Sequence, residues 1–395
     1  MLEITTPGLV ARIWLTQCGM SIIALVLLGI CTLWIALGLG AVVRTTRGSR
    51  RPTWSDDGPP VSVLKPLCGA DPGLAANLET FFRQDHPRCQ LVFGVEDPND
   101  PAVGVVSALI RKHPQVDAVL VIHSGGSALN PKVRNLTGML PHASHDLVLI
   151  SDSNVRAPTH YVSELVATLL SEERVGLVTN LFAGTGERSL GAALDAVQLN
   201  GFCAAGAALP TAVGDSLVVG KSMLFSRSTF ERLGGFGRVG AVLAEDFVIG
   251  KLYQHAGYRV RVAPTVLENH TGRLGFRACL RRHLRWSMLR WRLRPTFALL
   301  ELLVSPLLLM PVAWWLGGPW GFGWALSLLL LRDVGGWVAL RGWRRAWLPL
   351  LLSPVRELSM CAMWLLAPFK RHVSWRGHRA RLSAGTLLFE VRAQA

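Results

Sequence analysis

The sequence is poor in charged residues, which make up 17% of its 395 residues, whereas hydrophobic residues make up 50%. Its mean hydropathy is +0.34. This composition excludes an intrinsically disordered chain and a collagen-like repeat. The length leaves room for one soluble domain of about 200 residues and for additional apolar segments. We therefore expect a membrane protein.

Acidic residues are scarce too, because 26 Asp and Glu stand against 41 Lys and Arg, a formal net charge of +15. The seven cysteines include no CxxC pair, which predicts neither a disulfide framework nor a zinc site and favours a reducing compartment. The basic residues gather beside apolar runs, in the blocks Arg44–Arg51, Arg273–Arg294 and Lys370–Arg381. That placement favours the cytoplasmic surface of a membrane over a nucleic-acid groove.

An uncharged run from Ile13 to Val43 opens the chain. As a helix it is long enough to cross a hydrocarbon layer of roughly 30 Å. A cleaved signal peptide is the competing interpretation, but the run is too long for a typical signal and a basic cluster follows it. We expect a retained anchor with its N-terminus outside and Arg44 inside.

Apolar runs return after Pro295, and two further spans are expected, Phe297 to Leu316 and a run that ends at Leu340. The next run, from Ala346 to Phe369, is interrupted by Ser353-Pro354 and Arg356-Glu357. We interpret it as a re-entrant hairpin or an interfacial pair of helices, which also keeps the basic tail inside. An Arg-Glu pair buried in a bundle would still allow this run to cross.

Between these apolar ends, short β-rich runs alternate with segments of helical spacing. The expected strands are 61–65, 91–96, 118–122, 147–151 and 175–179, and the expected helices include 74–84, 102–113 and 159–171. This alternation predicts an α/β domain with a largely parallel sheet covered on both faces. Ligands of such sheets bind at the carboxyl ends of the strands.

Acidic residues follow two of these strands, with Asp97 and Asp100 after the second and Asp152 after the fourth. A third acidic cluster, Glu245-Asp246, opens a helical segment. Such carboxylates can contact a nucleotide or bind a divalent cation that bridges a diphosphate, although each one alone could equally cap a helix.

An RxxRW motif is formed by Arg282, Arg285 and Trp286 within the basic stretch. The spacing of three places both guanidinium groups on one helix face, where they can hold a diphosphate, and the indole can stack on a sugar or lipid headgroup. Anchoring to lipid phosphates is the alternative, mainly for Arg290, Arg292 and Arg294.

The order of these acids and of RxxRW resembles the membrane-bound inverting glycosyltransferases of GT-A (Rossmann-like) fold. The sequence most resembles the ceramide glucosyltransferase family. The matching segments are KPLCGADPGLAANLETFF (65–82), NDPA (99–102), NPKVRNL (130–136), SDSNVR (151–156), GKSMLF (220–225), AEDF (244–247), RRHLRW (281–286) and VSWRGHRARL (373–382). The Arg- and Ala-rich chain looks bacterial, which implies the inner membrane with the catalytic domain in the cytoplasm.

The resemblance implies a role for each matching residue. Asp246 is expected to be the general base on the acceptor hydroxyl. Asp152 is expected to bind Mg²⁺ or Mn²⁺ at the donor diphosphate, and Arg282, Arg285 and Trp286 complete the catalytic set. Contacts to a UDP-sugar are implied for Lys65, Pro66, Glu96, Asp97, Asp100, Lys132, Asn135, Asp152, Glu245 and Arg285.

These expectations divide the chain into five parts. They are an N-terminal anchor with its basic flank (1–51), a GT-A catalytic domain (52–270), a basic interfacial segment with RxxRW (271–296), transmembrane or re-entrant helices (297–369) and a basic cytosolic tail (370–395).

The expected partners are a UDP-sugar, a lipid acceptor and the membrane, with no nucleic acid. The leading hypothesis is transfer of glucose from UDP-glucose to the primary hydroxyl of ceramide with inversion. The Ala-rich segment 200–215 lacks the histidine-containing stretch expected of animal members. A hopanoid glycosyltransferase that uses UDP-N-acetylglucosamine is therefore an alternative. A processive polysaccharide synthase would need more spans, and a non-catalytic scaffold or transporter would leave the acids and RxxRW without a role.

Overall fold

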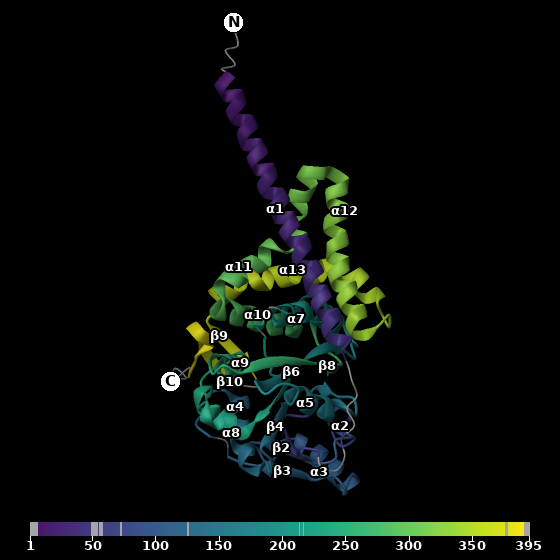
Figure 1. Cartoon of the computed structure of the whole chain (residues 1–395), viewed down its shortest axis with the longest axis vertical. Coiled ribbons are helices and arrows are strands. Elements are labelled where there is room, and N and C mark those ends of the chain that lie inside the picture. The colour runs from purple at the N-terminus through teal and green to yellow at the C-terminus, as the bar shows by residue number, and fades with distance from the viewer. Residues whose placement is uncertain are drawn as a thin grey trace.

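The computed structural model describes residues 7–48, 54, 58–71, 73–124, 126–212, 214–215, 217–375 and 378–390. A sheet-based body lies at one end, and helices gather at the other, where α1 and α12 rise away from the body (Figure 1). Of the basic residues expected to flank the anchor, Arg50 and Arg51 lie outside the described residues.

An eight-stranded sheet forms the body, with the strand order β3-β2-β1-β4-β7-β6-β8-β5. The half built from β3, β2, β1 and β4 is parallel. In the other half β7 runs antiparallel to both β4 and β6, and β5 runs antiparallel to β8. Strands β6 and β8 pair parallel to each other and run in the direction of β4, so the prediction of a largely parallel sheet is confirmed, with β7 and β5 as the two antiparallel strands. The strands are β1 Val61–Pro66, β2 Cys89–Val95, β3 Ala118–Ile122, β4 Leu147–Ser151, β5 Val155–Arg156, β6 Val175–Thr185, β7 Ser222–Ser226 and β8 Arg259–His270.

Alternate side chains of the central strands fill a separate core on each face of the sheet. In β2, Phe93 belongs to the core beneath α2, α3 and α5, whereas Val92 belongs to the core beneath α4, α8 and α9. Burial on both faces explains why these strands read as continuous apolar runs. The helices are α2 Leu74–Glu79, α3 Ala102–Lys112, α4 Pro131–Met139, α5 Tyr161–Leu169, α8 Arg227–Arg232 and α9 Glu245–His255.

A second group of helices lies at the end of the molecule where α1 and α12 rise away from the sheet (Figure 1). These are α1 Pro7–Thr46, α6 Leu190–Gln198, α7 Ala204–Ala212, α10 Phe276–Leu293, α11 Pro295–Leu303, α12 Pro306–Arg341 and α13 Trp347–Leu366, and a π-helical stretch, Leu199–Cys203, joins α6 to α7. In the described part of the chain, four segments are long and apolar enough to cross a membrane: Met20–Thr46, Leu190–Thr211, Pro306–Arg341 and Trp347–Phe369. The second of them is 72% buried inside the protein. We therefore place it in the protein core rather than in lipid.

Two expected features of the C-terminal helices are wrong. The expected span from Phe297 to Leu316 is divided between α11 and α12, and Gly318, with φ 52° and ψ −131°, bends α12 back on itself (Figure 1). The expected hairpin from Ala346 to Phe369 is one helix, α13, which contains Pro354 and lies across α12 rather than along it (Figure 1).

Buried ion pairs join α13 to α12. Arg356 of α13 pairs with Asp333 of α12 and with Glu357, and Arg332 Nη2 lies 2.7 Å from Glu357 Oε2. Each of the four charged groups thus has a partner of opposite charge, which offsets the cost of removing it from water.

A small antiparallel sheet, β9 His372–Trp375, β10 His378–Leu382 and β11 Leu388–Glu390, ends the described chain. The segment before β11 packs against the approach to α9, where the Leu243 amide donates to the Thr386 carbonyl at 2.9 Å and Leu388 donates to the Ala241 carbonyl at 2.8 Å. The C-terminal sheet therefore holds the loop that leads into Glu245 and Asp246.

Candidate active site at the strand ends

Asp152 follows β4, and its carboxylate lies between two ammonium groups. Lys132 Nζ, from the first turn of α4, is 2.9 Å from Oδ1, and Lys221 Nζ, from the residue before β7, is 3.4 Å from Oδ2. Burial alone would raise the pKa of Asp152, but these lysines outweigh it and hold the pKa below its usual range. Asp152 is therefore a permanent anion at the sheet edge.

Lys132 lies among Asp152, Glu245 and Asp246. Besides Asp152 it pairs with Glu245 Oε1 at 3.2 Å, and it donates to the Gly220 carbonyl at 2.7 Å. Burial would lower the pKa of Lys132, but Asp152, Glu245 and Asp246 raise it above its ordinary value. Lys132 therefore stays charged, although its side chain is only 11% exposed.

Asp246 lies in the first turn of α9, on the other side of Gly220. Its Oδ2 accepts from the Gly220 amide at 2.7 Å, and its Oδ1 accepts from the Phe247 amide at 2.8 Å. A Cβ at Gly220 would come within 2.9 Å of Asp246 Oδ2 and 3.1 Å of Lys132 Nζ, so the position needs a glycine. Burial raises the pKa of Asp246, although Lys132 opposes the shift. Two neighbouring acids with opposite pKa shifts are the pattern expected of a permanent anion beside a proton acceptor.

Two residues that were predicted to contact the donor, Lys65 and Asn135, instead donate hydrogen bonds to backbone carbonyls at the strand ends. Lys65 is fully buried, and its ammonium donates to the Asp152 carbonyl at 2.7 Å and lies 3.5 Å from the centroid of the Phe81 ring. Asn135 donates from Nδ2 to the carbonyls of Leu67 and Gly94 at 3.1 and 3.0 Å. Both fix the edge of the sheet, and Pro66 ends β1.

The acids after β2 also have structural partners. Glu96 forms a bidentate pair with Arg134, and Asp97 is exposed and accepts from the Asn99 amide at 2.8 Å. Asp100 accepts from the amides of Gly69 and Ala102, each at 2.8 Å. Asp100 therefore caps α3 in this structure, as the alternative interpretation anticipated.

The RxxRW motif lies on α10, with all three of its named residues half-buried. Arg282 Nη1 is 2.8 Å from Oδ2 of Asp195, a fully buried acid of α6. His283 Nε2 is 2.9 Å from Asp195 Oδ1, and its ring meets the indole of Trp286 edge-on, with centroids 5.1 Å apart. One face of α10 is thus held against α6 through a single carboxylate.

A chain of hydrogen bonds joins this arginine helix to the strand-end acid. From Asp195 Oδ2 it passes to Thr271 Oγ1 at 3.2 Å, and Asn269 Nδ2 donates to the same Thr271 oxygen at 3.3 Å. Asn154 Nδ2 donates to Asn269 Oδ1 at 2.9 Å, and Lys221 Nζ, the partner of Asp152, donates to Asn154 Oδ1 at 2.8 Å. Asp152, Glu245, Asp246 and Arg282 therefore belong to one connected network.

Sequence reasoning missed several members of this network, including Thr271. Lys221 and Asn154 stand inside the quoted segments GKSMLF and SDSNVR, so the motifs pointed to their neighbourhood. Asp195 gave a weaker signal, as an isolated acid in an apolar, Ala-rich helix, and Asn269 gave none.

The residues at the end of β4 fit a divalent cation. Asp152 Oδ2 and Asn154 Oδ1 both lie next to the ammonium group of Lys221. Two hard oxygen atoms therefore converge on one position, and that position already holds a positive charge. Asp195, Cys279 and His283 form another group whose ligand atoms lie within 4.8 Å of one another. It fits a metal poorly, because burial raises the pKa of the Cys279 thiol to about 12, which keeps the thiol protonated.

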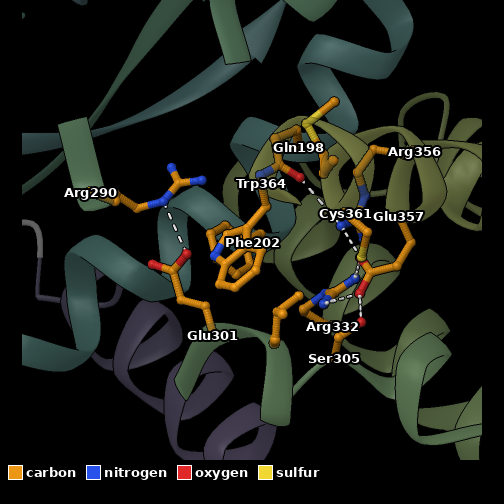
Figure 2. Close-up of a pocket in the computed structure, with 12 residues that line it drawn as sticks. Gln198, Phe202, Arg290, Glu301, Ser305, Arg332, Arg356, Glu357, Cys361 and Trp364 are labelled. Atoms are coloured by element: carbon orange, nitrogen blue, oxygen red, sulfur yellow. Dashed lines mark hydrogen bonds and ion pairs between the residues drawn. The ribbon is translucent and has the colours of Figure 1, made fainter. Parts of the chain in front are cut away.

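A cavity of about 40 Å³ lies apart from the acids (Figure 2). Its wall comes from α6, the π-helical stretch, α10, α11, α12 and α13, and Figure 2 shows the rings of Phe202 and Trp364 between two groups of ion pairs. Asp152, Asp246 and Arg285 are not among its lining residues. This cavity is therefore not the site at the strand ends.

The mixed sheet, the acids that converge at its strand ends and the adjoining apolar helices define a glycosyltransferase of GT-A fold. A solved mannosyltransferase from Pyrobaculum calidifontis, in complex with GDP-Man and Mn²⁺, shares this fold with a TM-score of 0.50 and 18% identity, over 89% of this chain and 99% of that one. The sequence model of glycosyl transferase family 21 matches residues 21–388. The chain belongs to that family, and it is a hexosyltransferase.

Curated relatives agree with this assignment. Ceramide glucosyltransferase 1 of Caenorhabditis elegans is 27% identical over 341 residues, which cover 83% of this chain and 72% of the relative. Ceramide glucosyltransferase 3 of the same organism is 28% identical over 252 residues, 62% of this chain and 53% of the relative. The chain thus spans about half of one relative and somewhat more of the other. The resemblance to the ceramide glucosyltransferase family is confirmed.

Proposed function

We propose that the protein transfers glucose from UDP-glucose to the primary hydroxyl of ceramide, with inversion at the anomeric carbon. The observation that carries this proposal is the convergence of Asp152 and Asp246 on Lys132 beside helices able to enter a membrane. The names of the curated relatives support glucose as the transferred sugar and ceramide as the acceptor.

Asp246 accepts the proton of the acceptor hydroxyl in this mechanism. Its pKa is raised, so it is a stronger base than an exposed aspartate, and the Gly220 and Phe247 amides fix its orientation. Direct attack of the activated hydroxyl from the side opposite the leaving group inverts the anomeric configuration.

The departing diphosphate needs positive charge on its own side of the reacting carbon. Lys132 stays charged at the sheet edge, and Arg282 and Arg285 present guanidinium groups that hold phosphate oxygens. Asp152 and Asn154 would hold Mg²⁺ or Mn²⁺, which supplies further charge neutralisation at the leaving group when bound. Lys132, Arg282 and Arg285 therefore position the donor.

The proposal also places the protein in a bacterial inner membrane, with the catalytic domain in the cytoplasm. The basic blocks beside the apolar helices support this orientation. Lipid and sugar nucleotide would then meet at the surface where α10 lies between the sheet and α11 to α13 (Figure 1).

The test is to incubate membranes containing the protein with UDP-glucose, UDP-galactose or UDP-N-acetylglucosamine and with ceramides, diacylglycerols or hopanoid polyols, and to read the product masses. Hexosylated ceramide formed from UDP-glucose supports the proposal. Product from hopanoid polyols and UDP-N-acetylglucosamine alone would replace it with the second candidate, which the Ala-rich helix α7 favours because the expected histidine is missing there.

A further inference from the structure

Asp195 is a fully buried carboxylate outside every motif that led to the proposed function. It lies on α6 and has three side-chain partners on other elements: Arg282 at 2.8 Å, His283 at 2.9 Å and Thr271 at 3.2 Å. A buried carboxylate is tolerated when it is paired and hydrogen-bonded, as this one is.

The three side-chain partners of Asp195 have different roles. Burial lowers the pKa of His283, so the imidazole is neutral and donates its Nε2 hydrogen to Asp195 without adding a charge. Arg282 brings the positive charge that balances Asp195, and its side chain is still 27% exposed. The guanidinium is therefore fixed by Asp195 through one of its donors, and it has further donors for a ligand.

Thr271 carries the connection toward the donor side. Through Asn269, which is 1% exposed, and Asn154 it reaches Lys221, the partner of Asp152. Asp195 and Asn269 are buried, whereas Thr271 and Asn154 are half-buried. A hydrogen-bonded chain of this kind fixes geometry, because displacing its buried members leaves a polar group unsatisfied. The distance between the arginine helix and the strand-end acid is thereby set.

We propose that Asp195 is a positioning residue for the donor diphosphate, which holds Arg282 at a fixed separation from Asp152 through Thr271, Asn269 and Asn154. The inference rests on the proposed function in one respect, namely that the donor is a nucleoside diphosphate sugar. It does not depend on which lipid is the acceptor.

The test measures UDP binding to the purified protein by calorimetry, with and without Mn²⁺, and the donor KM and kcat of the same samples. D195N removes the charge and keeps the shape. We expect UDP to bind about 10- to 100-fold more weakly, as for loss of an interaction with a charged partner. D195E, which restores the charge, should recover part of this loss.

A double-mutant cycle separates positioning from general stability. If Asp195 acts through Arg282, adding D195N to R282Q should weaken UDP binding by less than about twofold beyond R282Q alone. Independent, multiplying effects of the two substitutions would overturn the proposal, as would unchanged UDP binding in folded D195N. Should D195N fail to fold, T271V tests the same chain, with weaker UDP binding expected and an unchanged value overturning the proposal.

The matched control is E187Q. Glu187 is also a buried acid paired with arginines, Arg341 at 3.1 Å and Arg345 at 3.2 Å, but it has no described bond to the network. UDP binding should be unchanged in E187Q even if its melting temperature falls. Equal losses of UDP binding in E187Q and D195N would assign Asp195 a structural role only. Failure of the ceramide assay would leave all these binding results intact, so the two proposals fail separately.

Discussion

At the scale of single residues, the two acids Asp152 and Asp246 differ in the groups that surround their carboxylates. Asp152 has two lysines on its carboxylate, whereas Asp246 has backbone amides and one lysine beyond Gly220. The lysines hold the pKa of Asp152 below its usual range, whereas burial raises the pKa of Asp246 despite its amide donors and Lys132. The same side chain thus suits charge neutralisation in one place and proton transfer in the other.

Replacing Asp246 with Asn should abolish glycosyl transfer and leave UDP binding within about twofold of wild type, because the amide keeps the size of the side chain but accepts no proton. Turnover is measured by product mass and binding by calorimetry. A D246N protein with wild-type turnover would remove Asp246 from the role of base.

The raised pKa of Asp246 predicts a pH dependence. The base must be unprotonated, so kcat/KM should fall as the pH drops through a value above the usual aspartate pKa of about 4. Burial also raises the pKa of Glu245, and Glu245 and Asp246 titrate together. In E245Q the acid limb should persist and move to lower pH, since a neighbouring negative charge is gone. Disappearance of the limb would assign it to Glu245.

At the scale of elements, buried ion pairs decide how α12 and α13 pack. Arg356 is 1% exposed and contacts both Asp333 and Glu357, while Arg332 contacts the same two acids. Arg356 and Glu357 both follow Pro354, so these pairs fasten the second half of α13 to α12. Such tertiary contacts can outweigh the helix-breaking tendency of a proline.

R356M should destabilise the protein strongly, by about 3–5 kcal/mol, since it leaves two buried acids with one arginine. Thermal unfolding in detergent measures the loss. The matched control is R345M, whose side chain is 48% exposed and whose ion pair should contribute about 0–1 kcal/mol. Equal stability of both variants would show that the buried cluster is not important for packing.

At the scale of the whole molecule, the apolar helices lie at one end and the strand-end acids in the body (Figure 1). The N-terminal anchor is confirmed as a helix, and its segment Met20–Thr46 is long and apolar enough to span. The orientation of the body relative to the membrane stays a prediction.

Labelling of Cys68, an exposed residue of the catalytic body, tests the orientation. In a variant with the other six cysteines replaced by serine or alanine, a membrane-impermeant maleimide should label Cys68 in inside-out vesicles and leave it unlabelled in sealed right-side-out vesicles. Labelling in right-side-out vesicles alone would place the body outside. Detergent-opened vesicles, in which Cys68 should always be labelled, are the control.

Features that depend on local patterns were predicted from the sequence. The strands at 118–122 and 147–151 have the expected bounds, Asp152 follows β4, and Asp246 lies in the first turn of α9, where a helical segment was expected to begin. Periodicity, apolar length and motif order depend on residues that are close in the sequence, so they can be recognised without a structure.

Other features required the tertiary structure. The antiparallel insertion of β7, the continuous helix through Pro354 and the joining of Arg282 to Asp152 through Asp195 all depend on residues far apart in the chain. A side chain's partner across such a separation is set by the packing of whole elements, and nothing in its own segment encodes it. The sequence by itself determined the class of protein and the acids of the site, whereas packing decided which basic groups hold those acids in place.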